Sequence, residues 1–239
     1  MRCELLDVEG SFNVRDLGGY AVAGGRVTKH RRFLRAGSLA GLTKRGRQAL
    51  LDAGARCVID LRSAHEICAF PNALQNDGEF EYHHIPMLDY IRSSGNSGAT
   101  DNFPASMEDL YIGLLEESGA QFRRVFGLFA DSRYDCTIFH CTAGKDRTGV
   151  IAMLLLDLAG TDSASIAEDY SYSEALQTYV PQEDDPSGFP MFVFYSKPQT
   201  MLAVLARLHE RYGGARGYLS HIGVTPGQIE SVLDKFLGI

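Results

Sequence analysis

The order of apolar and polar positions along the chain predicts alternating strands and helices. Short apolar runs have the length of buried strands, and longer amphipathic stretches separate them. Strands are predicted near residues 32–35, 56–61, 81–85 and 135–140. Strands that alternate with helices favour a sheet flanked by helices. We therefore expect an α/β fold with a single domain over residues 1–239, whose central, mostly parallel sheet has four to five strands.

Capping residues indicate where several helices begin and end. Thr43 predicts the start of a helix that runs to about Ala53 and ends at Gly54. Thr225, with Pro226 in the first turn, predicts the start of another helix. Near the end of the chain we expect helices over residues 198–212 and 225–237.

Two segments interrupt this pattern. Residues 91–103 are polar and rich in glycine and serine, and they follow Asp89 almost directly. We interpret them as the hinge of a lid, with an ordinary surface connection as the alternative. Residues 178–196 combine acidic residues, prolines and aromatic residues. Their aromatic side chains either cover a pocket or pack against the core.

Composition limits the classes of partner. The 239-residue chain has a net charge of −7, which argues against binding to nucleic acid. Its hydrophobic fraction of 45% is ordinary for a globular protein. The five cysteines have neither disulfide-framework nor zinc-finger spacing. We therefore expect a reducing compartment and no metal ion or other cofactor.

The apolar runs predict neither a leader peptide nor a membrane segment. Residues 1–10 carry charges and lack the apolar core of a signal peptide. The longest apolar stretch, Val150 to Leu156, is far too short to cross a bilayer. We therefore expect a cytoplasmic protein without an integral membrane segment; export without a recognisable signal peptide is the alternative. The sequence leaves the oligomeric state open.

The ten residues from His140 to Gly149 carry the most specific chemistry of the chain. Their sequence is His140-Cys141-Thr142-Ala143-Gly144-Lys145-Asp146-Arg147-Thr148-Gly149. An apolar run precedes them and another follows, which is typical of a buried strand, a tight loop and a helix. The backbone amides of such a loop and the N-terminus of the helix point at one spot and form an anion site.

Cys141 is the candidate nucleophile. A cysteine at a helix N-terminus beside cations has a pKa of roughly 3.5 to 7.5 instead of about 8.5, and Lys145 and Arg147 supply the positive charge here. Its attack on phosphorus would give a cysteinyl-phosphate, which water would hydrolyse. Thr148 is placed to donate a hydrogen bond to the sulfur. An inert core cysteine is the structural alternative.

The other loop residues are expected to hold the phosphate. Arg147 offers a planar fork of donors for two phosphate oxygens. His140 is expected to orient the loop, because it leaves the strand on the face opposite Cys141. The predicted phosphate-binding residues are Thr142, Ala143, Gly144, Lys145, Asp146 and Arg147.

This motif resembles the signature of the cysteine-dependent protein tyrosine phosphatases, and its Gly-Lys-Asp-Arg-Thr-Gly ending is similar to their atypical bacterial branch. Further segments that look like this branch are Asn13–Tyr20, Arg35–Leu39, Ile59–Ser63 with Glu66, Gly217–Leu219 and Ile222–Thr225. The resemblance covers almost the whole chain. It implies a single-domain tyrosine-phosphatase-like fold and phosphatase activity without a cofactor.

A phosphatase also needs a proton donor for the leaving oxygen. The chain has no tryptophan, so the Trp-Pro-Asp loop that carries this acid in most tyrosine phosphatases is missing. We expect Asp89 to act instead, because it follows Ile85-Pro86 as the acid does in dual-specificity phosphatases. Asp60 is one alternative acid, because it lies at the end of a predicted strand, where ligands bind in open α/β sheets. Asp60 and Arg62 could equally form a structural ion pair. Asp146, inside the loop, is the second alternative, either as the acid or to position water.

The substrate class stays open at this point. Phosphotyrosine, phosphoserine or phosphothreonine in proteins, and phosphoinositides are all compatible with the loop. Lys145 either adds charge for a polyanionic head group or is a solvated residue at the rim. A catalytically weak phosphate-recognition module and a rhodanese-like sulfurtransferase are the alternative functions. We expect a phosphatase, since Cys141 and Arg147 are both present.

Overall fold

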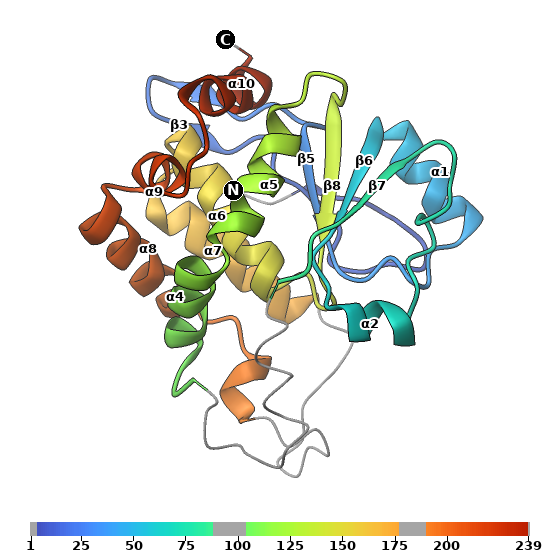
Figure 1. The fold of residues 1–239 in the computed structure, drawn as a ribbon, viewed down its shortest axis with the longest axis horizontal. Coiled ribbons are helices and arrows are strands. Elements are labelled where there is room, and N and C mark those ends of the chain that lie inside the picture. Colours follow the sequence, from blue (N-terminus) through green and yellow to red (C-terminus); the bar gives the residue numbers. More distant parts are fainter. Residues whose placement is uncertain (1–3, 88–103, 177–189, 239) are drawn as a thin grey trace.

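The structure is a computed structural model that describes residues 4–87, 104–176 and 190–238. A central sheet separates a small group of helices from a larger group (Figure 1). The strands are β1 (Glu4–Leu5), β2 (Arg15–Asp16), β3 (Ala21–Val22), β4 (Arg26–Val27), β5 (Phe33–Ala36), β6 (Ala55–Asp60), β7 (Glu81–His84) and β8 (Cys136–His140). The helices are α1 (Lys44–Asp52), α2 (Ala64–Ala69), α4 (Met107–Glu117), α5 (Gly119–Ala130), α6 (Asp146–Ala159), α7 (Ser163–Ala175), η2 (Met191–Phe194), α8 (Pro198–Tyr212), α9 (Ala215–His221) and α10 (Pro226–Leu237).

The main sheet is mixed but mostly parallel, as expected. Its order is β1-β2-β5-β8-β6-β7; β5, β8, β6 and β7 are parallel, and β1 and β2 pair antiparallel at one edge. All four predicted strands are present. The sheet has six strands rather than the expected four to five, because β1 and β2 are only two residues long and so short a strand has no readable alternation.

The central strands bury both faces. Phe33, Ile59 and Phe139 belong to a core shared with helices α4 to α10. Their neighbours along the strands, Val58 and Ile138, belong to a second core shared with α1. Side chains alternate between the two faces of a strand, and burial on both faces explains why these strands read as continuous apolar runs.

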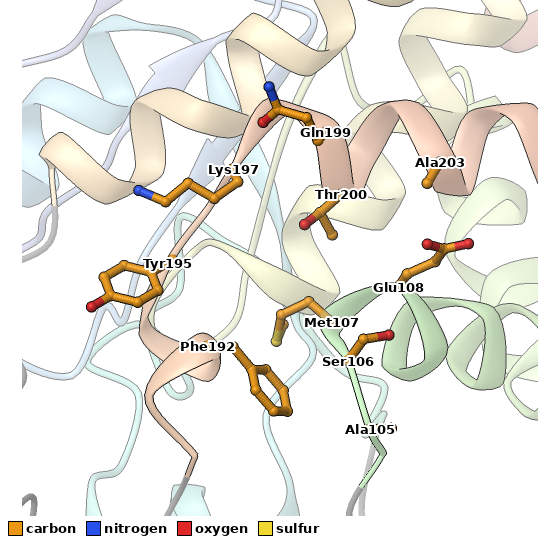
Figure 2. Close-up of a pocket in the computed structure, with 10 residues that line it drawn as sticks. All are labelled: Ala105, Ser106, Met107, Glu108, Phe192, Tyr195, Lys197, Gln199, Thr200 and Ala203. Atoms are coloured by element: carbon orange, nitrogen blue, oxygen red, sulfur yellow. The ribbon is translucent and has the colours of Figure 1, made fainter.

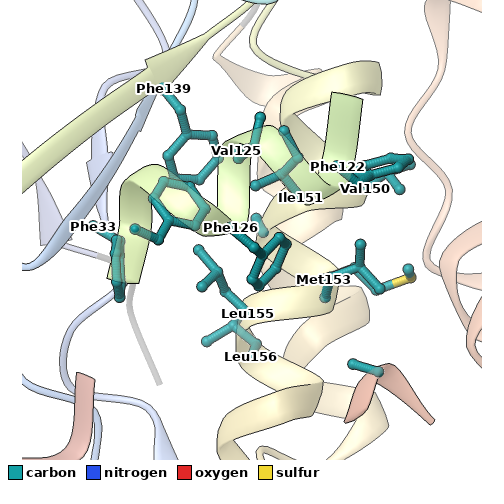
Figure 3. Packing of buried hydrophobic residues seen from close by; sticks show 14 of the residues in the cluster. Phe33, Phe122, Val125, Phe126, Phe139, Val150, Ile151, Met153, Leu155 and Leu156 are labelled. Atoms are coloured by element: carbon teal, nitrogen blue, oxygen red, sulfur yellow. The ribbon is translucent and has the colours of Figure 1, made fainter. Parts of the chain in front are cut away.

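Helix α6 lies at the centre of the larger core. Every residue from Thr148 to Leu156 is buried, which marks a helix surrounded by protein on all sides. Figure 3 shows Val150, Ile151, Met153, Leu155 and Leu156 of this helix close to aromatic rings of the core. The N-terminus of α6 is therefore held firmly beneath the carboxyl end of β8.

The predicted helix boundaries agree closely with the structure. Thr43 caps α1 by accepting a hydrogen bond from the Gly46 N–H. Thr225 caps α10 in the same way and forms a capping box with Gln228. Helix α8 has the bounds that the pattern predicted.

Three predictions fall wholly or partly on residues that the structure does not describe. Asp89 and the proposed hinge over residues 91–103 lie outside the described residues. Of the segment 178–196, only the part from residue 190 is described. It contains η2, in which Phe192 and Val193 pack against the larger core. Among the described residues, no helix is long and apolar enough to cross a membrane.

Candidate active site

Cys141 lies at the carboxyl end of the central strand β8 and opens a short loop that leads into α6. Its side chain is buried, and β5 and β6 flank β8 on either side. The carboxyl edge of a parallel sheet is where ligands bind in open α/β folds. The Cys141–Arg147 loop, meaning residues 141 to 147, therefore occupies the most favourable place for a site.

The first two carbonyl groups of the loop point outward. The Cys141 carbonyl accepts a hydrogen bond from His140 Nδ1 at 3.1 Å. The Thr142 carbonyl accepts one from the Ser38 N–H at 2.9 Å. His140 itself is buried, and its Nε2 lies 2.8 Å from Asn72 Nδ2. His140 thus contacts the outside of the loop, as the sequence predicted.

The next two carbonyl groups also point outward. Asn13 Nδ2 donates to the carbonyls of Ala143 at 3.0 Å and of Gly144 at 3.2 Å. Arg35 Nη2 donates to the same Gly144 carbonyl at 2.7 Å. Asn13 and Arg35 come from two of the segments whose sequence resembles the atypical branch, and the structure brings both of them to the back of the loop.

These contacts to four carbonyls determine where the amides of the loop point. In a planar trans peptide the N–H points opposite to the C=O, so four outward carbonyls direct the N–H groups of residues 142–145 inward. None of the four N–H groups has an acceptor among the described residues. Together with the N-terminus of α6 they form a concave set of donors that suits an anion.

Both the backbone conformation at position 144 and the close approach of a neighbouring strand require glycine there. Its φ is 68°, and a Cβ placed there would lie 2.6 Å from the carbonyl carbon and oxygen of Ala36. We predict that Gly144→Ala lowers the free energy of unfolding by about 2–4 kcal/mol, the sum of the left-handed backbone penalty and the clash. The matched control is Gly24→Ala, where φ is 82° but nothing lies within 4 Å. Urea denaturation of both variants measures the difference, and equal losses would show that the close approach costs nothing.

Arg147 is held by a carboxylate on α2. Its Nη1 and Nη2 donate to Glu66 Oε2 and Oε1 at 2.7 and 2.9 Å, in the two-bond geometry that guanidinium and carboxylate favour. Burial alone would raise the pKa of Glu66, but the bonds from Arg147 and Thr142 hold that pKa well below its usual range. Glu66 therefore stays ionised and fixes the plane of the Arg147 fork.

The hydroxyl of Thr148 is buried, and Oγ1 has no hydrogen-bond partner among the described residues. The expected bond to the Cys141 sulfur is thus not formed in this structure. The hydroxyl is nevertheless available, because no other group occupies it. Its role toward the sulfur stays a prediction.

Lys145 and Asp146 turn away from the interior of the loop. Lys145 is almost fully buried, and its Nζ donates to the carbonyls of Val193 and Tyr195 beside η2. Asp146 accepts a hydrogen bond from the Tyr111 hydroxyl at 2.7 Å, and its Oδ1 lies 3.2 Å from Lys145 Nζ. Lys145 is therefore neither a solvated rim residue nor directed at a bound phosphate here.

Asp60 forms the structural ion pair that the sequence left open. Arg62 Nη2 donates to its Oδ2 at 2.7 Å, and Asn72 and Tyr82 donate to the same oxygen. Burial alone would raise the pKa of Asp60, but His140, Arg62 and Asn72 hold it far below the usual range. A carboxyl group in this state has no proton to donate, so Asp60 supports the site and is unsuited to act as the acid.

A buried carboxylate behind the loop was not found from the sequence. Asp169 of α7 is 2% exposed and accepts hydrogen bonds from Arg15, Arg35 and the Tyr20 hydroxyl. Arg15 also donates to Asn13, one of the residues that hold the loop. The only sequence signal was the arginines themselves, since Asp169 lies in a helix whose pattern gives it no special place.

A separate pocket of about 470 Å³ lies between the starts of α4 and α8 and the η2 segment. Figure 2 shows Met107, Phe192, Tyr195 and Thr200 among its lining side chains. No residue of the Cys141–Arg147 loop lines it. One contact joins the two, because Lys145 of the loop donates to the carbonyl of Tyr195, which lines the pocket.

One group of side chains among the described residues has the spacing of metal ligands. It consists of Glu4, Asp16 and His30. His30 Nδ1 lies 2.9 Å from Glu4 Oε2 and 3.3 Å from Asp16 Oδ2. Asp16 also accepts hydrogen bonds from the N–H groups of Gly18 and Arg31, so these groups are satisfied by one another. Asp16 thus braces its own turn.

The fold and the loop define an α/β protein with a loop of inward-facing amides between the central strand and its helix. A model of the tyrosine phosphatase family matches residues 6–238, and the chain belongs to that family. It is similar to a "Tyrosine-protein phosphatase" of Nostoc commune, with 37% identity over 213 residues that cover 84% of this chain and 72% of the relative. It is also similar to the "Triple specificity protein phosphatase PtpB" of Mycobacterium tuberculosis, with 27% identity over 278 residues, 97% of this chain and 99% of the relative.

The comparisons agree with the expectations for family, fold and activity. The protein is a phosphatase, and phosphorylated molecules are its substrates.

Proposed function

We propose that the protein hydrolyses phosphomonoesters through a cysteinyl-phosphate on Cys141. The observation that carries this proposal is the set of four outward carbonyls, which leaves the amides of residues 142–145 free to bind phosphate oxygens. Arg147 completes the set with the donors that Glu66 leaves free, among them its Nε–H, which has no hydrogen-bond partner among the described residues. Donors fixed in this way stabilise the charge of the transferred phosphoryl group without reorganising during the reaction.

The reaction would proceed in two displacements. Cys141 Sγ forms a bond to phosphorus while the ester P–O bond breaks, and an acid gives its proton to the leaving oxygen. Water then attacks phosphorus, the S–P bond breaks, and inorganic phosphate and the thiolate are released. Thr148 Oγ1 would donate to the sulfur as it leaves. The equatorial oxygens stay on the loop amides and on Arg147 in both steps.

Asp89 is our proposed acid. Asp60 is held in its ionised form by Arg62 and His140, and Asp146 is occupied by Tyr111 and Lys145. Both observations favour an acid from outside the described residues, and Asp89 lies two residues beyond Met87, where a described segment ends.

We predict that Asp89→Asn lowers kcat by about 10²–10³-fold for aryl phosphates with poor leaving groups and by less than about tenfold for good ones. A leaving group of low pKa departs without a proton, so only poor leaving groups need the acid. The measurement is kcat against leaving-group pKa, with Asp60→Asn and Asp146→Asn as comparisons. A loss for Asp89→Asn that is equal across the series, or a steeper dependence in Asp146→Asn, would contradict the assignment.

Phosphotyrosine is the substrate class that we propose first, with phosphoserine, phosphothreonine and phosphoinositides as further substrates. The support is the similarity to the mycobacterial relative, a triple-specificity phosphatase that aligns over nearly all of both chains. The test is phosphate release from matched phosphotyrosine and phosphoserine peptides and from a phosphoinositide, each with EDTA present. A lack of turnover on all of them by folded protein would favour a phosphate-recognition module instead.

A further inference from the structure

The Gly144 carbonyl differs from the three before it in the kind of donor that it accepts. Among the described residues, the Thr142 and Ala143 carbonyls accept from neutral N–H groups and the Cys141 carbonyl accepts from the His140 ring. The Gly144 carbonyl accepts from Asn13 and, at 2.7 Å, from the Arg35 guanidinium. Hydrogen bonds from a charged donor are short and strong. Such a bond also polarises the peptide unit, which makes the Lys145 N–H on its other side a better donor.

The direction of Arg35 depends on Asp169. Arg35 is fully buried, and one arm of its guanidinium pairs with Asp169 while the other reaches Gly144. Asp169 also pairs with the buried Arg15. Two guanidinium groups thus share one carboxylate, and without it they would repel each other in a medium of low polarity. Asp169 therefore fixes both cations in one arrangement.

We infer that Asp169 is a positioning residue for the phosphatase reaction: through Arg35 it fixes the Gly144 carbonyl outward and so aims the loop amides at the phosphate. Asp169 itself touches neither the nucleophile nor the substrate. The inference rests on the proposed function, because it assigns the loop amides to phosphate binding.

Orientation and net charge make opposite predictions for one variant. Asp169→Asn removes a negative charge near the loop, so an effect of charge alone would favour the Cys141 thiolate and anion binding. An effect of orientation would instead disfavour the thiolate and weaken anion binding. Without Asp169 the two arginines separate, and Arg35 no longer holds the Gly144 carbonyl. Arg35→Lys keeps the charge but loses the planar fork. An effect of charge alone therefore predicts unchanged thiolate formation and anion binding, whereas an effect of orientation predicts that both are reduced.

The test uses two readouts that do not need turnover. The first is the rate of Cys141 alkylation by iodoacetamide at pH 6, which reports the thiolate, and the second is the inhibition or binding constant of inorganic phosphate. We expect both Asp169→Asn and Arg35→Lys to slow alkylation and weaken phosphate binding by about tenfold, the effect of one charge-assisted hydrogen bond. Faster alkylation in Asp169→Asn, or an unchanged Arg35→Lys, would overturn the inference.

A matched control separates positioning from a general loss of stability. Leu50→Ala opens a cavity in the core that α1 shares with the sheet and destabilises the fold without touching the loop. At a temperature where all variants are folded, we expect it to alkylate and bind phosphate like the wild type. If the Asp169 variant matches this control, the residue is only structural. If the wild type itself binds no phosphate, that result contradicts the proposed function as well as this inference.

Discussion

Replacing Cys141 by serine is expected to lower kcat for p-nitrophenyl phosphate by at least about 10³-fold. The hydroxyl of serine is a far weaker nucleophile than the sulfur of cysteine at neutral pH. The loop donors are untouched by the change, since the carbonyls of residues 141–144 keep their partners. The variant should therefore bind inorganic phosphate about as well as the wild type.

Two further measurements make this result specific. Wild-type turnover should be the same with and without EDTA, and acid quenching during turnover of a labelled substrate should trap phosphate on the wild type and none on Cys141→Ser. Turnover that survives the serine change would exclude the cysteine mechanism. Turnover that EDTA abolishes would point to a different class of hydrolase.

Arg147→Lys is expected to lower kcat/KM by about 10²–10⁴-fold. Lysine keeps the positive charge but cannot bind two phosphate oxygens while also pairing with Glu66 through both arms. Because we propose that Arg147 contacts the phosphoryl group in the transition state, we expect kcat to fall by more than KM rises. Steady-state kinetics on one aryl phosphate provides the measurement.

Glu66→Gln tests whether the ion pair is what orients Arg147. The amide keeps the shape of the side chain but loses the charge, so we expect a smaller loss of about tenfold to 10²-fold. In the double variant with Arg147→Lys, the two losses should not add, because both act on the same fork. Full additivity would show that Glu66 affects catalysis by another route.

Local patterns in the sequence predicted the chemical centre and the framework around it. The four parallel strands, the capped helices and the loop from His140 to Gly149 are each encoded by residues close together in the chain. Apolar runs, capping residues and a nucleophile followed by a basic helix start can be read without knowing the fold. That is why the bounds of α8 and the cap of α10 agree with the prediction.

The partners of the loop could not be predicted in the same way. Glu66 is 81 residues from Arg147 in sequence, and its local pattern with Ser63 indicates only the start of a helix. Asp169 is 134 residues from Arg35. The sequence predicted Lys145 to be either a substrate-binding cation or a solvated residue at the rim. In the structure it is buried against the carbonyls beside η2.

The sequence by itself thus determined the candidate nucleophile, the short loop between the central strand and its helix, and the class of sheet, because each depends on neighbouring residues. The tertiary structure decided which side chains hold the loop open: Asn13, Arg35 and His140 on its carbonyls, Glu66 on Arg147 and Asp169 behind them. These contacts join segments that are distant in the chain, and only the fold brings the residues of α2, α7 and the first strands within hydrogen-bond distance of the loop and of one another.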